Sequence, residues 1–198
     1  MIDQTNKNKR TIIIVALMSI IPFMIAWGLT ESSTFRLPST NRGDLIEPII
    51  TTERSELSGM DAFTVKNIKE LSGHWVMLNF ISGGICDQLC KDAMHATKQI
   101  RLMLNKDLTR VRRALIVMEG KQEASFSSWW EDDLRLLKLQ PSKSLLEKIK
   151  AYKPEGISNG AIIIMDPLGN LMMHYGADFD PYAVKGDLKK LLRISQIG

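Results

Sequence analysis

Two cysteines, Cys86 and Cys90, are the residues of this chain whose type and spacing most directly suggest chemistry. They lie in the sequence GGICDQLCK, where a glycine turn leads into a predicted amphipathic helix. Residues four apart on a helix share a face and have β-carbons about 5–6 Å apart, which is close to the separation that a disulfide bridges. The partial positive charge at a helix N-terminus favours a thiolate at Cys86. The pair therefore predicts a dithiol/disulfide couple or a soft-metal site.

The same pair has a structural alternative, which is a stabilising disulfide without chemistry or two small buried apolar residues. A bridge that closes so short a loop removes little conformational entropy from the unfolded chain and stabilises the fold weakly. We therefore favour redox or metal chemistry, and the enzyme class that this indicates is a thiol-disulfide oxidoreductase.

The surrounding elements follow from hydrophobic periodicity and turn residues. Proceeding along the chain, we expect a short edge hairpin near 63–68, a strand at 75–80, an amphipathic helix at 89–104, a strand at 111–118, two helical pieces over 127–152 divided around Pro141, a strand at 161–165, a DPLG turn at 166–169, a strand at 171–175 and a helix at 186–194. From residue 75 onward, the order β-α-β-α-β-β-α predicts an α/β domain of the thioredoxin-like type, with a mixed central sheet and flanking helices. Cys86 then follows the carboxyl end of the first central strand, where open α/β sheets place their sites.

His174 ends the last predicted strand and should come up at the same end of the sheet as Cys86, which makes it a candidate metal ligand or base. His95 falls on the polar side of its helix and His74 at the far end of the sheet, so neither is expected at the site. The chain has 11 methionines. Thioethers bind Cu(I), but we assign these residues to the apolar N-terminal segment and to core packing.

Residues 11–29 form an uncharged apolar stretch long enough to cross a bilayer as a helix. Lys7, Lys9 and Arg10 precede it, so the positive-inside rule places residues 1–10 in the cytoplasm. The stretch is longer than the apolar region of a signal peptide and is followed by no A-x-A site, which favours an uncleaved anchor. We expect residues 30–58 to be a linker or extended arm and residues 59–198 to be a periplasmic domain at a bacterial inner membrane, where thiols are oxidisable.

Composition and motifs exclude several function classes. The 26 Lys and Arg residues exceed the 22 Asp and Glu residues by only four, and they are not interleaved with aromatic residues, so nucleic acid is not an expected partner. The two cysteines and three histidines lack zinc-site spacing, and no P-loop, G-x-S-x-G or H-E-x-x-H motif occurs. The basic group Lys106, Arg110, Arg112 and Arg113 is expected to form a solvated face, with anionic lipid or an acidic partner as the alternative.

An anchored, exported thioredoxin-like domain with C-x-x-x-C after its first core strand resembles the Sco/SenC family of cytochrome c oxidase assembly proteins. The apolar strand and D-P-x-G turn at 162–169 are also similar to that family, and the resemblance covers about 61–194. The segment TNRGDLIEP at 40–48 is similar to the arm of small membrane proteins that accompany haem-copper oxidase assembly factors in proteobacteria. The resemblance implies copper bound by two cysteines and one histidine, with oxidase subunits or other assembly factors as partners at the inner membrane.

Three positions depart from the family pattern. Asp87 and Lys91 occupy places where the family usually has prolines, and Ser158 stands where its ligand histidine is expected. The implied metal is therefore Cu(I) on Cys86 and Cys90, with His174 as the candidate third ligand. Two functions remain open, namely thiol or Cu(I) chemistry in oxidase assembly, and a non-catalytic membrane-anchored scaffold or interaction domain whose cysteines are structural or vestigial.

Overall fold

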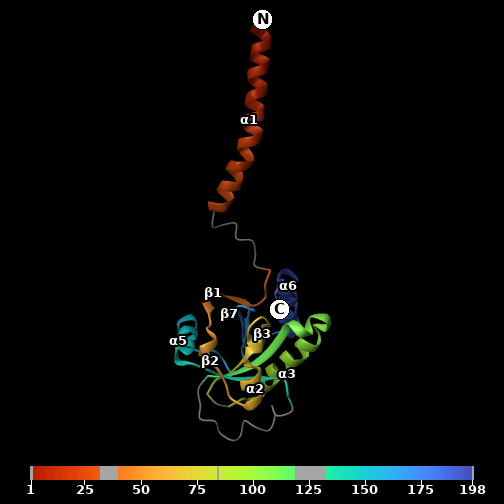
Figure 1. The fold of residues 1–198 in the computed structure, drawn as a ribbon. Helices are drawn as coiled ribbons and strands as arrows, with labels where there is room; N and C mark the ends of the chain where they lie inside the picture. Colours follow the sequence, from red (N-terminus) through yellow and green to blue (C-terminus); the bar gives the residue numbers. More distant parts are fainter. Residues whose placement is uncertain (1, 32–39, 84, 119–132, 198) are drawn as a thin grey trace. The chain divides into compact units, whose positions relative to one another are not determined.

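The computed structural model describes residues 2–31, 40–83, 85–118 and 133–197 (Figure 1). The chain divides into two compact units, Met1–Thr40 and Asn41–Gly198, which we describe separately. The first unit contains helix α1 (Ile2–Glu31). Its segment Asn8–Gly28 is long and apolar enough to cross a membrane, and no other helix among the described residues is. Its apolar side chains are exposed within the chain, as the surface of a lipid-embedded helix would be.

The second unit is built on a seven-stranded mixed sheet with the strand order β1-β7-β6-β3-β4-β5-β2. The strands are β1 (Asp44–Thr51), β2 (Leu57–Gly59), β3 (Trp75–Ile81), β4 (Val111–Val117), β5 (Leu137–Pro141), β6 (Ile162–Met165) and β7 (Asn170–Tyr175). Strands β3, β4 and β5 are parallel to one another, whereas β6 is antiparallel to β3, and β7 is antiparallel to β6. Strand β3 is buried along its whole length, which explains its nearly continuous apolar run.

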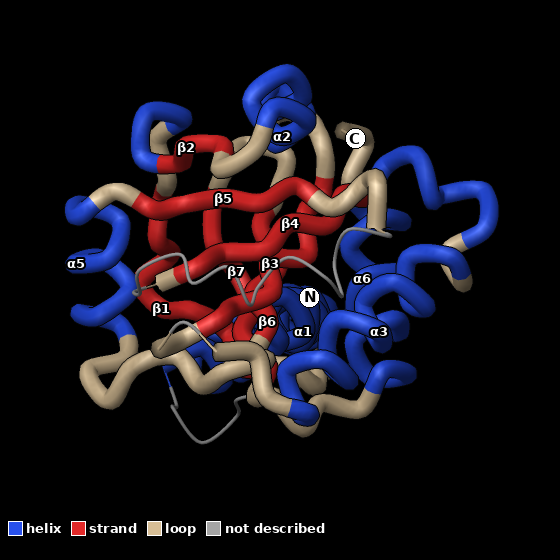
Figure 2. Tube along the Cα trace, turned by 90° about the horizontal axis from the view of Figure 1, so that it is seen from below, coloured by secondary structure: helices blue, strands red, loops and turns tan. Residues whose placement is uncertain are grey.

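Helices cover the sheet on both faces. They are α2 (Ala62–Asn67), α3 (Gln88–Leu102), α5 (Lys143–Tyr152) and α6 (Pro181–Ile194), together with the short 3-10 turns η2 (Arg54–Glu56), η3 (Ile68–Leu71) and η4 (Asn105–Arg110). Figure 2 shows α5 on one side of the strands and α3 and α6 on the other. This confirms the predicted α/β fold, a mixed sheet with flanking helices.

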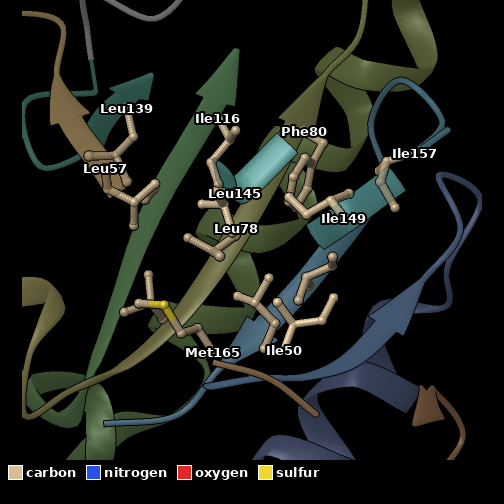
Figure 3. Close-up of a cluster of buried hydrophobic side chains, with 14 of the residues drawn as sticks. Ile50, Leu57, Leu78, Phe80, Ile116, Leu139, Leu145, Ile149, Ile157 and Met165 are labelled. Atoms are coloured by element: carbon tan, nitrogen blue, oxygen red, sulfur yellow. The ribbon is translucent and has the colours of Figure 1, made fainter. Parts of the chain in front are cut away.

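Alternation along β3 divides the core between the two faces. Val76, Leu78 and Phe80 pack in one cluster with Leu145 and Ile149 of α5 (Figure 3). The intervening residues of β3 face the other way, because successive side chains of a strand point to opposite faces of the sheet. This second side of the core lies beneath α3 and α6 and contains two clusters, one of which includes both cysteines.

Two local predictions were wrong. Residues 137–141 are strand β5 instead of helix, and there buried Leu137 and Leu139 alternate with Lys138 and Gln140 while the strand pairs with β4 and β2. Residues 63–68 form α2 and the start of η3 instead of a hairpin. Asp61 caps α2 by accepting a hydrogen bond from the N–H of Thr64. The expected helical residues 127–132 lie outside the described part of the chain.

Residues 44–59, which the sequence assigns mainly to the linker or arm, contribute both edge strands of the sheet. Strand β1 buries Ile46 and Ile50 and pairs with β7. Just before it, the backbone N–H groups of Arg42 and Gly43 donate to Oδ2 of Asp187 on α6, at 2.6 and 3.3 Å. The compact unit therefore begins at the NRG sequence, which docks on a buried carboxylate.

Candidate functional site

Cys86 and Cys90 form a disulfide with an S–S distance of 2.01 Å and a Cα–Cα distance of 5.2 Å. The bond lies between the carboxyl end of β3 and the first turn of α3, as the spacing predicts. Cys86 is 8% exposed, whereas Cys90 is 1% exposed. Cys86 is therefore the cysteine that solvent or a partner reaches first.

Asp87 separates the two cysteines and acts as the N-cap of α3. Its Oδ1 accepts a hydrogen bond of 2.9 Å from the backbone N–H of Cys90. The cap orders the first turn of the helix, which contains Cys90. Its carboxylate also offsets part of the positive end of the helix dipole, which weakens the stabilisation that a thiolate at Cys86 would receive.

The loop that leads into β6 packs directly on the cysteine segment. Gly160 has a φ of +84°, and a β-carbon there would lie 2.9 Å from the Cys90 Cα. Beside it, the Asn159 Nδ2 donates to the backbone oxygen of Ile85 at 2.8 Å, while the Asn159 Oδ1 is buried without a hydrogen-bond partner in the described structure. Ser158, at the position where the related family has its histidine, is exposed. This loop therefore presents an amide to the disulfide region and no imidazole.

His174 lies on the opposite face of the sheet from the disulfide. It is 3% exposed on β7, stands opposite Ile163 in the register, and makes an edge contact with Tyr152 of α5 at 6.3 Å between ring centroids. Burial, followed by the nearby ammonium of Lys153, lowers the pKa of His174 below its ordinary value. The ring is therefore a neutral component of the core under α5.

The structure thus brings Cys86 and Cys90 together but does not bring His174 to them. The prediction used the direction of the last strand, which is correct, but it ignored the alternation of side chains along that strand. His95 is exposed on α3, and His74 contacts Arg112 at the start of β3, away from the cysteines. Within the described ranges, no group of three or more His, Cys, Asp or Glu side chains could hold a metal.

A buried polar network continues from the cysteine helix into the sheet. Arg113 is 5% exposed, and its guanidinium donates to Asp133 Oδ2 at 2.5 Å, to the backbone oxygen of Met94 at 2.9 Å and to Thr97 Oγ1 at 3.2 Å. Thr97 in turn donates to Asn79 Oδ1 at 3.0 Å. Sequence reasoning missed this network, although a lone Asn in an apolar strand is a signal for one.

The expectation of a solvated basic face was therefore wrong for three of its four members. Arg113 is buried, Arg112 pairs with Glu70, and Arg110 donates to the backbone oxygens of Leu192 and Ser195. These arginines hold the second compact unit together.

Together, the mixed sheet, its flanking helices and a dithiol pair after the first central strand define a thioredoxin-like protein. The chain belongs to the family described as transmembrane-like, thioredoxin-like, C-terminal domain, whose family model matches residues 75–195. No curated protein sequence matches the chain.

Solved structures of Sco proteins share this fold. Copper-bound yeast Sco1 is 16% identical to the chain, with a TM-score of 0.51 over 64% of this chain and 83% of that one. Apo Sco1 from Thermus thermophilus is 14% identical, with a TM-score of 0.53 over 78% of this chain and 98% of that one. The predicted resemblance to Sco-like thioredoxin-fold proteins is thus confirmed at the level of fold.

Proposed function

We propose that the protein is a membrane-anchored thioredoxin-like factor that assists the assembly of a respiratory cytochrome oxidase, acting on thiols or on Cu(I) through Cys86 and Cys90. The observation that carries the proposal is the Cys86–Cys90 disulfide at the start of α3, with Cys86 the more accessible partner. The likeness in fold to Sco1, which is known with copper bound and in the apo form, supports the choice of chemistry. The link to oxidase assembly rests on the Sco/SenC resemblance.

The geometry suits reversible thiol exchange. In the reduced protein, the Cys86 thiolate attacks a partner disulfide and forms a mixed disulfide, releasing one partner thiolate. Cys90 then loses its proton to solvent and attacks the Cys86 sulfur, which releases the second partner thiolate. Two electrons pass to the partner and the Cys86–Cys90 bond is restored. The Asn159 side chain is bonded to this segment through Nδ2, and its unpartnered Oδ1 can accept a hydrogen bond from a thiol S–H when the disulfide is open.

The donor chemistry of the pair fits Cu(I) as cargo better than Cu(II). Reduction of the disulfide yields two soft sulfur ligands, which Cu(I) accepts, whereas Cu(II) sites also use imidazole nitrogen. None of the three histidines lies beside the pair, because His174 faces α5, His95 is exposed on α3 and His74 precedes β3. Ser158 stands where the Sco/SenC resemblance implies a ligand histidine. We therefore expect the reduced protein to retain Cu(I) and to hold Cu(II) weakly.

We place the domain in the periplasm, with α1 as an uncleaved anchor in the inner membrane. Lys7, Lys9 and Arg10 before the apolar segment support this orientation. A reporter enzyme active only in the cytoplasm, fused after Gly198, should be silent, while an export-dependent phosphatase at the same position should be active. Strong activity of the cytoplasmic reporter would reverse the assigned topology.

A scaffold role is the second candidate, and the burial of the disulfide favours it. Both cysteines belong to one apolar cluster with Ile81, Leu115 and Leu136. A bond enclosed in this way can serve packing alone. In that case the domain would bind an assembly partner without exchanging electrons or metal.

Stepwise alkylation of the full chain in detergent micelles separates the two candidates. The oxidised protein is treated with a dithiol reductant without denaturant, and its thiols are then labelled at increasing pH and identified by mass spectrometry. We expect the bond to open in the folded protein and Cys86 to be labelled before Cys90. Cys86→Ser and Cys90→Ser provide single-thiol controls. A bond that opens only after urea unfolds the protein would support the scaffold instead.

A further inference from the structure

A third sulfur-containing residue, Met94, continues the four-residue spacing of the two cysteines. Cys86, Cys90 and Met94 are each four residues apart, so the sequence reads C-x-x-x-C-x-x-x-M across the start of α3. Residues four apart on a helix occupy the same face. Met94 therefore follows Cys90 on the side of α3 that faces the sheet.

Burial and contacts agree with this placement. Met94 is 4% exposed and belongs to the same cluster as both cysteines. The other members of that cluster are aliphatic side chains from strands β3 and β4 and from the residue before β5, with Met60 packed at the margin. The apolar cluster around the disulfide therefore contains a third sulfur donor besides the two cysteines.

The direction of the Met94 side chain also favours contact with the cysteines. Long side chains of an α-helix lean toward its N-terminus and cover the preceding turn. In α3 the turn that precedes Met94 contains Cys90. We therefore expect the Met94 thioether to lie toward the cysteine pair, in agreement with its place in the same cluster.

We propose that the thioether of Met94 is the third ligand of a Cu(I) ion held by reduced Cys86 and Cys90. This inference rests on the proposed function, because it requires the pair to work as thiols. A dithiol reductant first reduces the Cys86–Cys90 bond and is itself oxidised to a disulfide. The two new cysteine thiols release their protons as Cu(I) binds. A neutral thioether adds a soft ligand without adding charge, which suits an apolar cluster where a further buried charge is costly.

The test is an anaerobic titration of the reduced full chain in detergent with Cu(I), in competition with a chromogenic Cu(I) chelator. Met94→Leu nearly conserves side-chain volume and removes the sulfur. We expect it to weaken Cu(I) binding at least about tenfold, the lower end of the loss seen when even an outer-shell partner of a metal site is removed. The matched control is Met77→Leu, because Met77 is buried on the same side of the sheet but in the other cluster. Met77→Leu should leave the affinity unchanged.

X-ray absorption of the Cu(I)-loaded wild-type protein gives a readout that does not depend on any variant folding. Three sulfur neighbours per copper are expected in the wild type and two in Met94→Leu. If the wild type binds Cu(I) with only two sulfur neighbours, or if Met94→Leu binds as tightly as wild type, Met94 is not a ligand although the proposed copper function stands. A loss of affinity in Met60→Leu instead would move the third ligand to Met60 and overturn the assignment. No Cu(I) binding by the reduced wild type would remove both this inference and the copper branch of the proposed function.

Discussion

Replacing Gly160 with alanine tests whether the loop before β6 is packed against the cysteine helix as closely as the structure indicates. Gly160 has a φ of +84°, and an added β-carbon would lie 2.9 Å from the Cys90 Cα and 3.2 Å from its N. Both contacts are with backbone atoms, so no flexible side chain can move aside. The loop or the first turn of α3 must shift.

Gly156 offers a matched control on the same loop. Its φ is +89°, and an added β-carbon would meet nothing within 4 Å. Both substitutions therefore carry the left-handed backbone penalty of about 1–2 kcal/mol, and both recover about 0.4–1 kcal/mol through the unfolded chain. Gly160→Ala alone adds overpacking, which costs about 1–3 kcal/mol. The difference in unfolding free energy between the two variants is therefore about 1–3 kcal/mol.

Urea unfolding of the full chain in micelles measures this difference. For an m-value of about 2 kcal/mol/M, the midpoint of Gly160→Ala should fall about 0.5–1.5 M below that of Gly156→Ala. Gly160→Ala should also change the rate at which reductant opens the disulfide, because the shifted backbone belongs to Cys90. Equal midpoints for the two variants would refute the reasoning that the loop holds the cysteine helix in place.

Three further predictions concern the framework of the site. Asp187 accepts hydrogen bonds from Arg42, Gly43 and Tyr175, and although burial alone raises its pKa, these bonds and Lys190 lower it below 3.8. The contribution of Asp187 to stability is therefore present above pH 3.8 and lost as the pH falls through the folded-state pKa. Asp187→Asn should flatten the acid limb of a stability–pH curve measured by urea unfolding. An unchanged acid limb would contradict this. Arg113→Met leaves Asp133 without its buried partner and should lower the free energy of unfolding by about 3–5 kcal/mol. Arg112→Met, at a more exposed ion pair, should lower it by less than about 1 kcal/mol in the same assay. Similar losses for the two variants would argue against the buried network. Replacing both cysteines with serine should cost only about 2 kcal/mol, the chain-entropy value for so short a ring, and a thermal-unfolding loss of twice that size would indicate a structural bond.

Much of the fold follows from the sequence because the central elements are strongly patterned. Strands β3, β4 and β6 are short apolar runs bounded by turns, and their burial on both faces makes this signal clear. Strand β5 was missed because its alternation is only five residues long and ends at Pro141. It becomes a strand through pairing with β4 and β2, and a single-sequence pattern does not record those partners.

At the site, the spacing of the cysteines predicted their disulfide correctly, but the strand pattern did not predict which face of the sheet His174 occupies. The disulfide between Cys86 and Cys90 follows from their separation and from the helix start. His174 was expected at the correct end of the sheet, but whether a residue faces α3 or α5 depends on register, which the strand's direction does not specify. Met94, the proposed third ligand, could have been identified as a candidate from the sequence, since it extends the four-residue spacing of the cysteines by one more turn.

The equilibrium reduction potential of the Cys86–Cys90 bond tests the central claim most directly. The oxidised full chain in micelles is equilibrated with buffers of defined thiol/disulfide ratio, quenched, and its free thiols are counted. A pair that exchanges electrons or is opened to receive Cu(I) should have a potential within the range of thiol oxidoreductases, about −120 to −270 mV. A potential below about −300 mV, typical of structural disulfides, would contradict the account and leave the protein a scaffold.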